Sequence, residues 1–293
     1  MTNTLVIGLV LLSAIIHAFR DFLTKKAKDK QVFVWLYGIS GLILFLPIFI
    51  YFLSREGIKN SFGFYISIAS GFFIFIYFYF LTKSYEKGDL SHVYPIMRSA
   101  PALVLIFAVI FLREQVSIIG VLGIFLVLLG TYTINMKKMS LSELFKPIKL
   151  IFENKSVKFA FLTSISLATV SIIDKIGVSY IHPMVYFYFI FLFTFTFFTP
   201  YVLHVKDKLL IKNEWKVNKK TILINGFFLI FGYILILIAF TIEKVSYVVG
   251  LRQLSVVFAV LLGGYILKEE YRMIRFTSSA LIFIGIFLIS IAN

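Results

Sequence analysis

The chain has 293 residues, of which 60% are apolar and 15% are charged, and its mean hydropathy is +0.96. These values lie outside the range of ordinary soluble domains and exclude a soluble fold. The formal net charge of +15 would suggest nucleic-acid binding in a soluble protein, but most of these cations lie in short segments between apolar stretches, so no nucleic-acid partner is expected.

Ten apolar stretches follow one another along the chain. A membrane-spanning helix needs about 20 apolar residues, because each residue rises 1.5 Å and the hydrocarbon core is about 30 Å thick. Stretches of about this length lie near 4–23, 32–53, 63–83, 91–111, 116–136, 157–177, 184–204, 221–240, 246–266 and 274–292. The first should be a retained helix and not a signal peptide, because its Lys cluster follows it. The sequence therefore predicts an all-α polytopic membrane protein with ten transmembrane helices in a lipid bilayer.

The second half of the chain repeats the first at a shift of 155 residues. This shift matches Ser91 with Ser246, Glu114 with Glu269 and Gly130 with Gly285. Each half holds five spans, an odd number, so the second half should enter the membrane from the opposite side and the repeats should be inverted. We divide the chain into a first five-helix repeat (1–136), a cytoplasmic linker (137–156) and a second five-helix repeat (157–293). Inverted repeats are a common build for secondary transporters, with the substrate site near the midplane.

The linker 137–156 has two interpretations. It contains a helix-start pattern, Ser140-Leu141-Ser142-Glu143, and apolar residues amid lysines, which suit a short amphipathic helix on an anionic membrane surface. A plain connection between the repeats fits the same residues.

Two arginines lie inside predicted spans four and nine. At 1.5 Å per residue, Arg98 and Arg252 should lie roughly 9–13 Å below their own membrane surfaces. Burying an Arg near the bilayer centre costs about 2.5–3.5 kcal/mol, so such residues indicate function unless they clamp helix-end carbonyls or extend to the surface. The guanidinium group suits carboxylate or phosphate recognition because its planar fork offers paired donors.

Span four carries further candidates for a substrate-binding wall. Pro95 and Pro101 lie on either side of Arg98 in the sequence, and each removes a backbone donor. The carbonyls left free then need hydrogen-bond donors from protein, water or substrate. Tyr94 lies one turn before Arg98 and should share its face. The proline kinks could instead only shape helix packing. The shift of 155 places Arg98 opposite Gln253, one residue from Arg252, so we expect an asymmetric site that includes Gln253.

A second group of candidates could relay protons or ions. His17, Arg20 and Asp21 lie close together in span one, and the charge of a histidine changes near neutral pH. Asp174 ends span six. An interfacial ion pair between Asp21 and Lys25 explains the span-one residues equally well.

The sequence lacks the residues and motifs that several functions require. All 14 acidic residues are expected at span ends or in loops, which disfavours exchange of protons for lipophilic cations. The absence of cysteine excludes disulfides and thiolate metal sites. No HExxH zinc motif, phosphate loop or GxSxG nucleophile is present. We therefore expect neither an enzyme nor a bound cofactor or metal.

The chain resembles the EamA-type branch of the drug/metabolite transporter superfamily over most of its length. The likeness rests on the ten spans in a five-plus-five repeat and on Leu112-Arg113-Glu114 and Leu267-Lys268-Glu269 after the fourth and ninth spans. Local pieces that look like one subgroup are His17-Ala18 with Lys25, Gly88-Asp89-Leu90-Ser91 with Tyr94-Pro95 and Arg98, Asp174-Lys175, and Leu251-Arg252-Gln253. Members of the family export amino acids, other metabolites and lipid-linked sugars.

These observations together indicate a secondary active transporter in the cell membrane that moves a small anionic or zwitterionic metabolite by alternating access between two halves, with proton or ion coupling as an open option. A flippase for a phosphate-headed or lipid-linked substrate is the first alternative. A membrane enzyme or scaffold without transport is the alternative from another class.

The distribution of Lys and Arg predicts the orientation in the membrane. We count 21 in segments after odd-numbered spans, five after even-numbered spans and three within spans, which accounts for all 29. Positively charged loops stay cytoplasmic, so both termini should lie outside, although EamA-type proteins are usually expected to keep theirs inside. Reporter fusions after Asn293 should therefore be extracytoplasmic and fusions near Lys212 cytoplasmic. The reverse result at both sites would show that the charge rule fails here.

Overall fold

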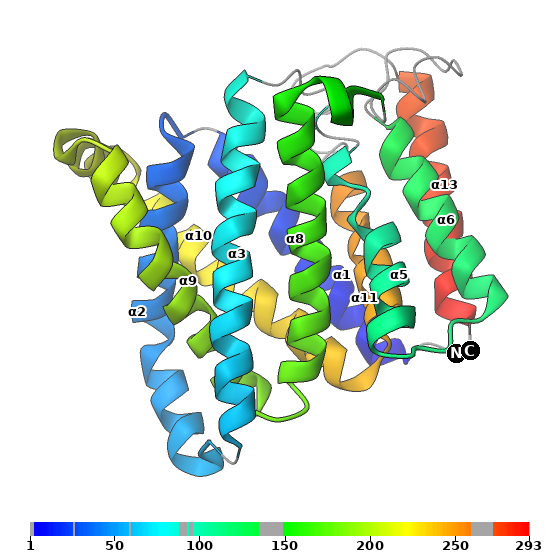
Figure 1. Ribbon diagram of the computed structural model, residues 1–293, viewed down its shortest axis with the longest axis horizontal. Helices are drawn as coiled ribbons and strands as arrows, with labels where there is room; N and C mark the ends of the chain where they lie inside the picture. Colours follow the sequence, from blue (N-terminus) through cyan, green and yellow to red (C-terminus); the bar gives the residue numbers. More distant parts are fainter. Residues whose placement is uncertain are drawn as a thin grey trace.

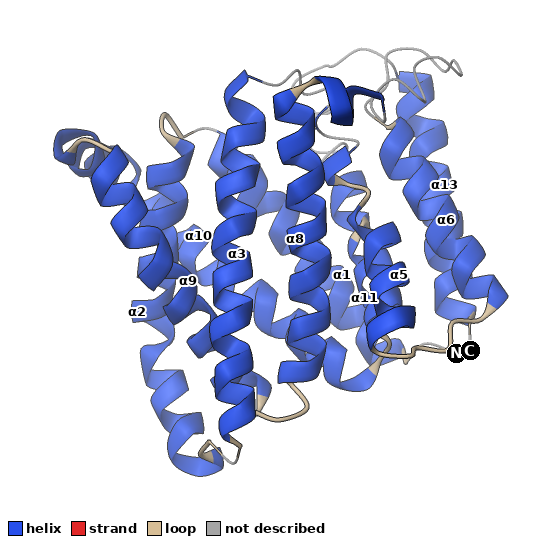
Figure 2. Cartoon of the chain, viewed as in Figure 1, coloured by secondary structure: helices blue, strands red, loops and turns tan. Residues whose placement is uncertain are grey.

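The computed structural model describes residues 3–25, 27–58, 60–87, 93, 96–134, 149–258 and 272–292. Within this part the chain is helical and contains no strand, as Figure 2 shows. The helices, labelled in Figure 1, are α1 (Thr4–Lys25), α2 (Lys30–Glu56), α3 (Ser61–Lys87), α5 (Ala100–Phe111), α6 (Ile118–Thr133), α8 (Lys155–Gly177), α9 (Pro183–Val205), α10 (Lys208–Ile242), α11 (Val245–Arg252) and α13 (Arg272–Ile291).

Five helices are long and apolar enough to cross a membrane. They are α2, α3, α8, α9 and α10, and the predicted spans two, three, six, seven and eight fall on them. The other predicted spans fall on shorter apolar helices, Thr4–Arg20, Ala100–Phe111, Ile118–Thr133, Val245–Phe258 and Phe276–Ile291. The structure is therefore that of a multi-pass membrane protein, while the count of ten crossings stays a prediction.

Several helices extend beyond the apolar stretch that predicted them. Helix α10 has 35 residues and begins at Lys208, whereas the predicted span began at 221. It starts there because the Asp207 carboxylate accepts a hydrogen bond from the Leu209 backbone N–H at 3.0 Å. Asp29 caps α2 and Asn154 caps α8 in the same way. Hydropathy marks the part of a helix that lies in hydrocarbon, but the polar cap decides where the helix begins.

Part of the predicted linker is described. Residues 149–153 form a helical turn, and α8 begins at Lys155 directly after Asn154. The proposed helix start at Ser140-Leu141-Ser142-Glu143 lies outside the described residues, so neither interpretation of the linker is tested.

The two repeats pack on each other reciprocally. Helix α3 packs on α8 and α9, and the corresponding helix of the second repeat, α10, packs on α1 and α2. The contact of α5 with α8 likewise corresponds to that of α11 with α1. Equivalent helices also pair directly, as α2 with α9, α5 with α11, and α6 with α13. This is the packing expected of two repeats related by a twofold axis.

Glycines on α6 and α13 show the repeat at the level of single residues. A Cβ atom at Gly123 would lie 2.7 Å from the Gly285 carbonyl oxygen, and one at Gly130 would lie 2.6 Å from the Ser278 carbonyl oxygen. A shift of 155 converts the first contact into the second, because it takes 123 to 278 and 130 to 285. Small residues let the two backbones touch, as is common between membrane helices.

The two ends of the molecule carry different segments of the chain. Both termini lie at one end, and the start of α2 and the end of α9 meet at the other (Figure 1). At that second end the Lys206 Nζ lies 2.6 Å from the Asp29 carboxylate. The lysine-rich start of α10 lies there too. Which end faces the cytoplasm stays a prediction.

The glycine contacts between α2 and α10 should be essential for stability. A Cβ atom at Gly226 would lie 2.5 Å from the Tyr37 carbonyl oxygen and 2.8 Å from the Gly41 nitrogen. Because neither backbone can yield without moving a helix, Gly226→Ala should lower the free energy of unfolding by about 1–3 kcal/mol. Thermal unfolding of the detergent-purified protein measures this. Gly8→Ala is the matched control, since nothing lies within 4 Å of its Cβ position; equal melting temperatures for both variants would contradict the packing described here.

Candidate functional site

A small cavity lies beside the middle of α1. It is lined by Ser13, Ile16, His17 and Arg20 of α1, by Phe228, Leu229, Gly232 and Tyr233 of α10, and by Arg252 of α11. Its volume of about 10 Å³ leaves room for about one water molecule. Three helices from both repeats therefore converge on one polar cavity.

Positive charge dominates this cavity. The Nη2 of Arg20 lies 2.7 Å from the His17 Nδ1. The charge of Arg252 interacts electrostatically with those of Arg20 and Arg98, and His17 interacts with all three arginines. Among the described residues that line the cavity, none carries a carboxylate. The arrangement can therefore attract an anionic group.

Helix breaks place Arg98 and Arg252 where they are. Residues 98 and 99 form a turn before α5, and Gln253 forms a turn between α11 and the helical residues 254–258. The backbone N–H of Ser99 bonds the Ile96 carbonyl, and that of Gln253 bonds the Gly250 carbonyl, each at 3.1 Å. Both breaks lie at equivalent positions of the repeat. Discontinuous helices at this position are a common way for membrane transporters to build substrate sites.

A residue of the second repeat hydrogen-bonds the free carbonyls at the break before α5. The Ser164 hydroxyl of α8 donates to the Ile96 carbonyl at 2.7 Å and to the Met97 carbonyl at 3.1 Å. The Met97 carbonyl, which Pro101 leaves without its helical donor, is thus bonded by a protein hydroxyl. Pro101 itself is the second residue of α5, where a missing N–H costs nothing.

Gln253 carries an unsatisfied buried acceptor. Its side chain is 7% exposed, and within the described part of the chain its Oε1 atom has no hydrogen-bond donor. Leaving a buried acceptor unpaired costs about 1–3 kcal/mol, so the atom is suited to accept a hydrogen bond from a ligand.

A buried carboxylate lies behind the cavity wall. Asp174 is three residues from the end of α8, yet it is only 1% exposed. Its Oδ1 accepts hydrogen bonds from Ser70 Oγ of α3 at 2.5 Å and from Tyr186 Oη of α9 at 3.1 Å. Its Oδ2 accepts a hydrogen bond from the Tyr233 hydroxyl of α10. Position along a helix therefore did not reveal how deeply this acid is buried.

The structure brings some of the predicted site residues together and leaves others apart. Arg98, Arg252, His17 and Arg20 share one electrostatic neighbourhood, and Asp174 is joined to it through Tyr233. Gln253 follows Arg252 directly. Pro101 does not line the cavity. Tyr94 and Pro95 lie outside the described residues, and so does the side chain of Asp21.

Sequence reasoning missed the residues contributed by α10. Tyr233 both lines the cavity and bonds Asp174. Asn225 is fully buried, and its Nδ2 reaches the Arg20 carbonyl at 3.4 Å. The available signal was the interruption of a long apolar run by Asn225-Gly226 and again by Gly232-Tyr233, seven residues apart and therefore near one face of the helix.

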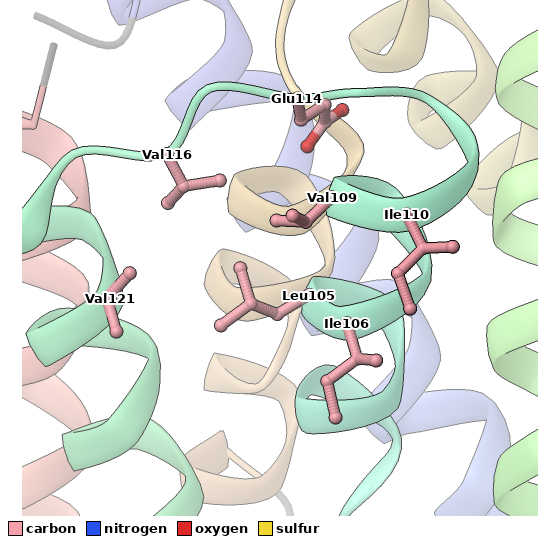
Figure 3. A pocket seen from close by; sticks show the side chains of 7 residues that line it. All are labelled: Leu105, Ile106, Val109, Ile110, Glu114, Val116 and Val121. Atoms are coloured by element: carbon pink, nitrogen blue, oxygen red, sulfur yellow. The ribbon is translucent and has the colours of Figure 1, made fainter.

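Glu114, one of the acidic residues that carried the family resemblance, has a structural role. Its carboxylate accepts hydrogen bonds from the Val245 N–H and the Ser246 hydroxyl, both at 2.7 Å, and so caps the start of α11. It also lies at the end of an apolar groove of about 430 Å³ between α5 and α6. Figure 3 shows Leu105, Ile106, Val109 and Ile110 on one side of this groove and Val121 on the other.

Comparison with known proteins identifies relatives by family and by fold. The model of the EamA-like transporter family matches residues 4–136 and 154–291. A solved structure titled "Crystal structure of protein" is similar with a TM-score of 0.71 and 14% sequence identity, covering 99% of each chain. This likeness shows the fold alone. No curated protein matched.

Ser164 should be needed to hold the turn that carries Arg98. Ser164→Ala removes the donor for the Ile96 and Met97 carbonyls, which should lower the free energy of unfolding by about 1–3 kcal/mol. Ser166→Ala is the control, because the Ser166 hydroxyl bonds only the Leu162 carbonyl of its own helix. Thermal unfolding of both variants measures the difference, and an equal effect would show that the turn does not depend on α8.

Proposed function

The chain belongs to the EamA-like transporter family, within the drug/metabolite transporter superfamily of membrane proteins, and we propose that it is a secondary active transporter for a small anionic or zwitterionic metabolite. The observation that carries the proposal is the pair Arg20 and Arg252 in the cavity wall, on which the charge of Arg98 also acts. Guanidinium groups recognise carboxylate and phosphate through paired hydrogen bonds. An amino acid or an organic acid supplies such a group.

Electrostatics favours an anionic group over a cationic one. Charges interact more strongly in a low-dielectric interior than in water, so an added anionic group is favoured near these arginines and an added cationic group is disfavoured. The described cavity lining offers His17 beside these arginines and no carboxylate. A cationic drug would add to the repulsion, whereas a carboxylate would relieve it.

The dimensions of the cavity support alternating access. Room for about one water molecule is too little for a metabolite, so the helices must separate before a substrate can bind. The breaks at Arg98-Ser99 and Gln253 supply places where α5 and α11 can bend without disturbing a continuous helical ladder. Both breaks adjoin the arginines, so bending there would change the site itself.

Lipid flipping is the alternative, and the groove between α5 and α6 is the observation in its favour. The groove has a volume of about 430 Å³, and its lining is almost wholly apolar, as an acyl chain requires (Figure 3). It shares no lining residue with the arginine cavity. A flippase needs a continuous path for the headgroup from such a groove to the cationic site, so transport of a water-soluble metabolite is the better-supported function.

The proposal predicts charge-selective binding that depends on Arg252 in the cavity wall and on Arg98, whose charge acts on the same site. Arg252→Gln and Arg98→Gln should each weaken binding of the preferred substrate by about 2–5 kcal/mol, because one half of a buried charge pair is lost. Arg98→Lys should restore binding only partly, since a point charge cannot make a two-pronged contact. A thermal-shift screen of amino acids, carboxylates and phosphate esters identifies the substrate, and binding is then measured on each variant.

Arg55→Gln is the matched control, because it removes the same charge from a residue at the end of α2, where Arg55 lies over the Tyr51 ring, and no residue of α2 lines the cavity. Unchanged affinity in both Arg98→Gln and Arg252→Gln would end the anion-site proposal. A membrane enzyme or scaffold would instead show neither ligand-dependent stabilisation nor flux into liposomes for the wild type.

A further inference from the structure

Asp174 lies outside the cavity lining but is one hydrogen bond away from it. Tyr233 contributes to the cavity wall and donates its hydroxyl to the Asp174 Oδ2. A Cβ at Gly177, one turn after Asp174, would overlap the Tyr186 ring, so the absence of a side chain there lets Tyr186 reach the carboxylate. Four helices, α3, α8, α9 and α10, thus converge on one acidic group.

The partners of Asp174 are hydroxyl groups and not cations. Ser70, Tyr186 and Tyr233 each offer one O–H, and within the described part of the chain Asp174 forms no ion pair. A buried charge without a paired ion is costly in a medium that excludes water. Binding a proton neutralises the carboxylate and removes that cost. The cluster is therefore built to tolerate both charge states.

The helices packed around Asp174 differ in the titratable and charged groups that they present to it. Helix α9 presents Tyr186, α10 presents Tyr233, and α3 presents Ser70, which does not titrate. Helix α11 contributes Arg252, whose charge acts on Asp174 without an ion pair between them. Two remaining groups, Lys175 and His17, point elsewhere.

Lys175, next to Asp174 in the chain, donates to the Phe240 and Glu243 carbonyls at the end of α10. His17 faces the cavity and lies beside Arg20. The three hydroxyls therefore bond Asp174 and neither of these two groups. His17 is the other residue that could carry the proton, so an experiment must distinguish it from Asp174.

We propose that Asp174 binds the proton that drives transport, and that Tyr233 and Arg252 transmit its charge state to the substrate cavity. This inference rests on the proposed function, because it assumes that the cavity holds an anionic group. The step is a simple proton exchange in which the carboxylate gains or loses H⁺ and no other bond forms or breaks.

Protonation must rearrange the hydroxyl cluster. An ionised carboxylate accepts hydrogen bonds from all three hydroxyls, but a protonated one must itself donate from one oxygen. The Tyr233 oxygen can accept a hydrogen bond from the protonated carboxyl, and its own O–H then turns toward the cavity, where it can donate a hydrogen bond to a substrate oxygen. Loss of the negative charge also leaves the field of Arg252 uncompensated, which strengthens its attraction for an anion.

The sign of the coupling follows. An anion binds more tightly when Asp174 is protonated, and by reciprocity the proton binds more tightly when the anion is present. The two should therefore cross together, so that an inward proton gradient drives uptake of the anion. Anion affinity should fall as pH rises through the range in which Asp174 loses its proton, and typical coupling factors are about 5- to 150-fold.

Infrared spectroscopy of the purified protein tests proton binding without a substrate. Lowering the pH should produce a protonated-carboxyl C=O band in the wild type that is missing in Asp174→Asn. Asp207→Asn, which removes an exposed acid that caps α10, should keep the band. A band that persists unchanged in Asp174→Asn would overturn the proposal, whatever the substrate is.

Proteoliposomes loaded with a pH-sensitive dye test the coupling. The probe is a mixture of the common amino acids and small dicarboxylates, added outside at matched pH. Wild-type vesicles should acidify as substrate enters and should accumulate it several-fold under an inward proton gradient. Asp174→Asn should abolish both effects yet retain exchange of internal for external substrate, and its affinity should be high and independent of pH. Tyr233→Phe should keep the infrared band but reduce the pH dependence of affinity.

The outcomes separate the two proposals. Substrate flux without proton movement, or proton-driven accumulation that survives in Asp174→Asn but not in His17→Gln, would overturn the coupling role and leave the transporter proposal standing. A wild type that neither binds nor moves any component of the mixture would count against the proposed function, while the infrared band would still decide whether Asp174 binds a proton. If Asp174→Asn does not fold, Tyr233→Phe and Ser70→Ala supply the comparison.

Discussion

A backbone group that leaves a helix inside the hydrocarbon core must find its hydrogen-bond partner in the protein, because no water is there to replace it. Much of this structure follows from that constraint. Ser164 donates to the carbonyls freed at the turn of Arg98, and Glu114 accepts from the amides at the start of α11. Lys175 bonds the carbonyls that end α10. Ser164 thus satisfies the interruption beside Arg98, and Glu114 and Lys175 do the same for the start of α11 and the end of α10.

Two of these contacts also join the repeats. Ser164 of the second repeat binds carbonyls of the first, and Glu114 of the first caps a helix of the second. The most extensive helix packing likewise runs between repeats, in α3 with α8 and α6 with α13. A rigid rocking of residues 1–136 against 157–293 would have to separate these surfaces. Motion confined to the interrupted helices would leave them intact.

The sequence supplied the positions of the apolar helices and the shift of 155 residues, because hydropathy and a duplicated pattern are properties of the chain itself. The resemblance to the EamA family is confirmed by the family match. The grouping of Arg98 with Arg252 was expected from their equivalent spans. The role of Asp174 was only partly foreseen, because its burial depends on Ser70, Tyr186 and Tyr233, which come from three other helices. The cap at Asp207 was missed because polar residues beyond an apolar run look like a loop in a hydropathy profile.

The reciprocal glycine contacts carry an evolutionary consequence. Since Gly123 on Gly285 and Gly130 on Ser278 are the same contact seen from each repeat, a single ancestral five-helix polypeptide could have made this interface with a second copy of itself inserted in the opposite orientation. Gene fusion would then have released each copy from having to serve both roles. The occurrence of Arg252 where the first repeat has Met97 is a divergence of the kind that gene fusion permits. It makes the substrate site asymmetric although the two repeats have nearly the same helix arrangement.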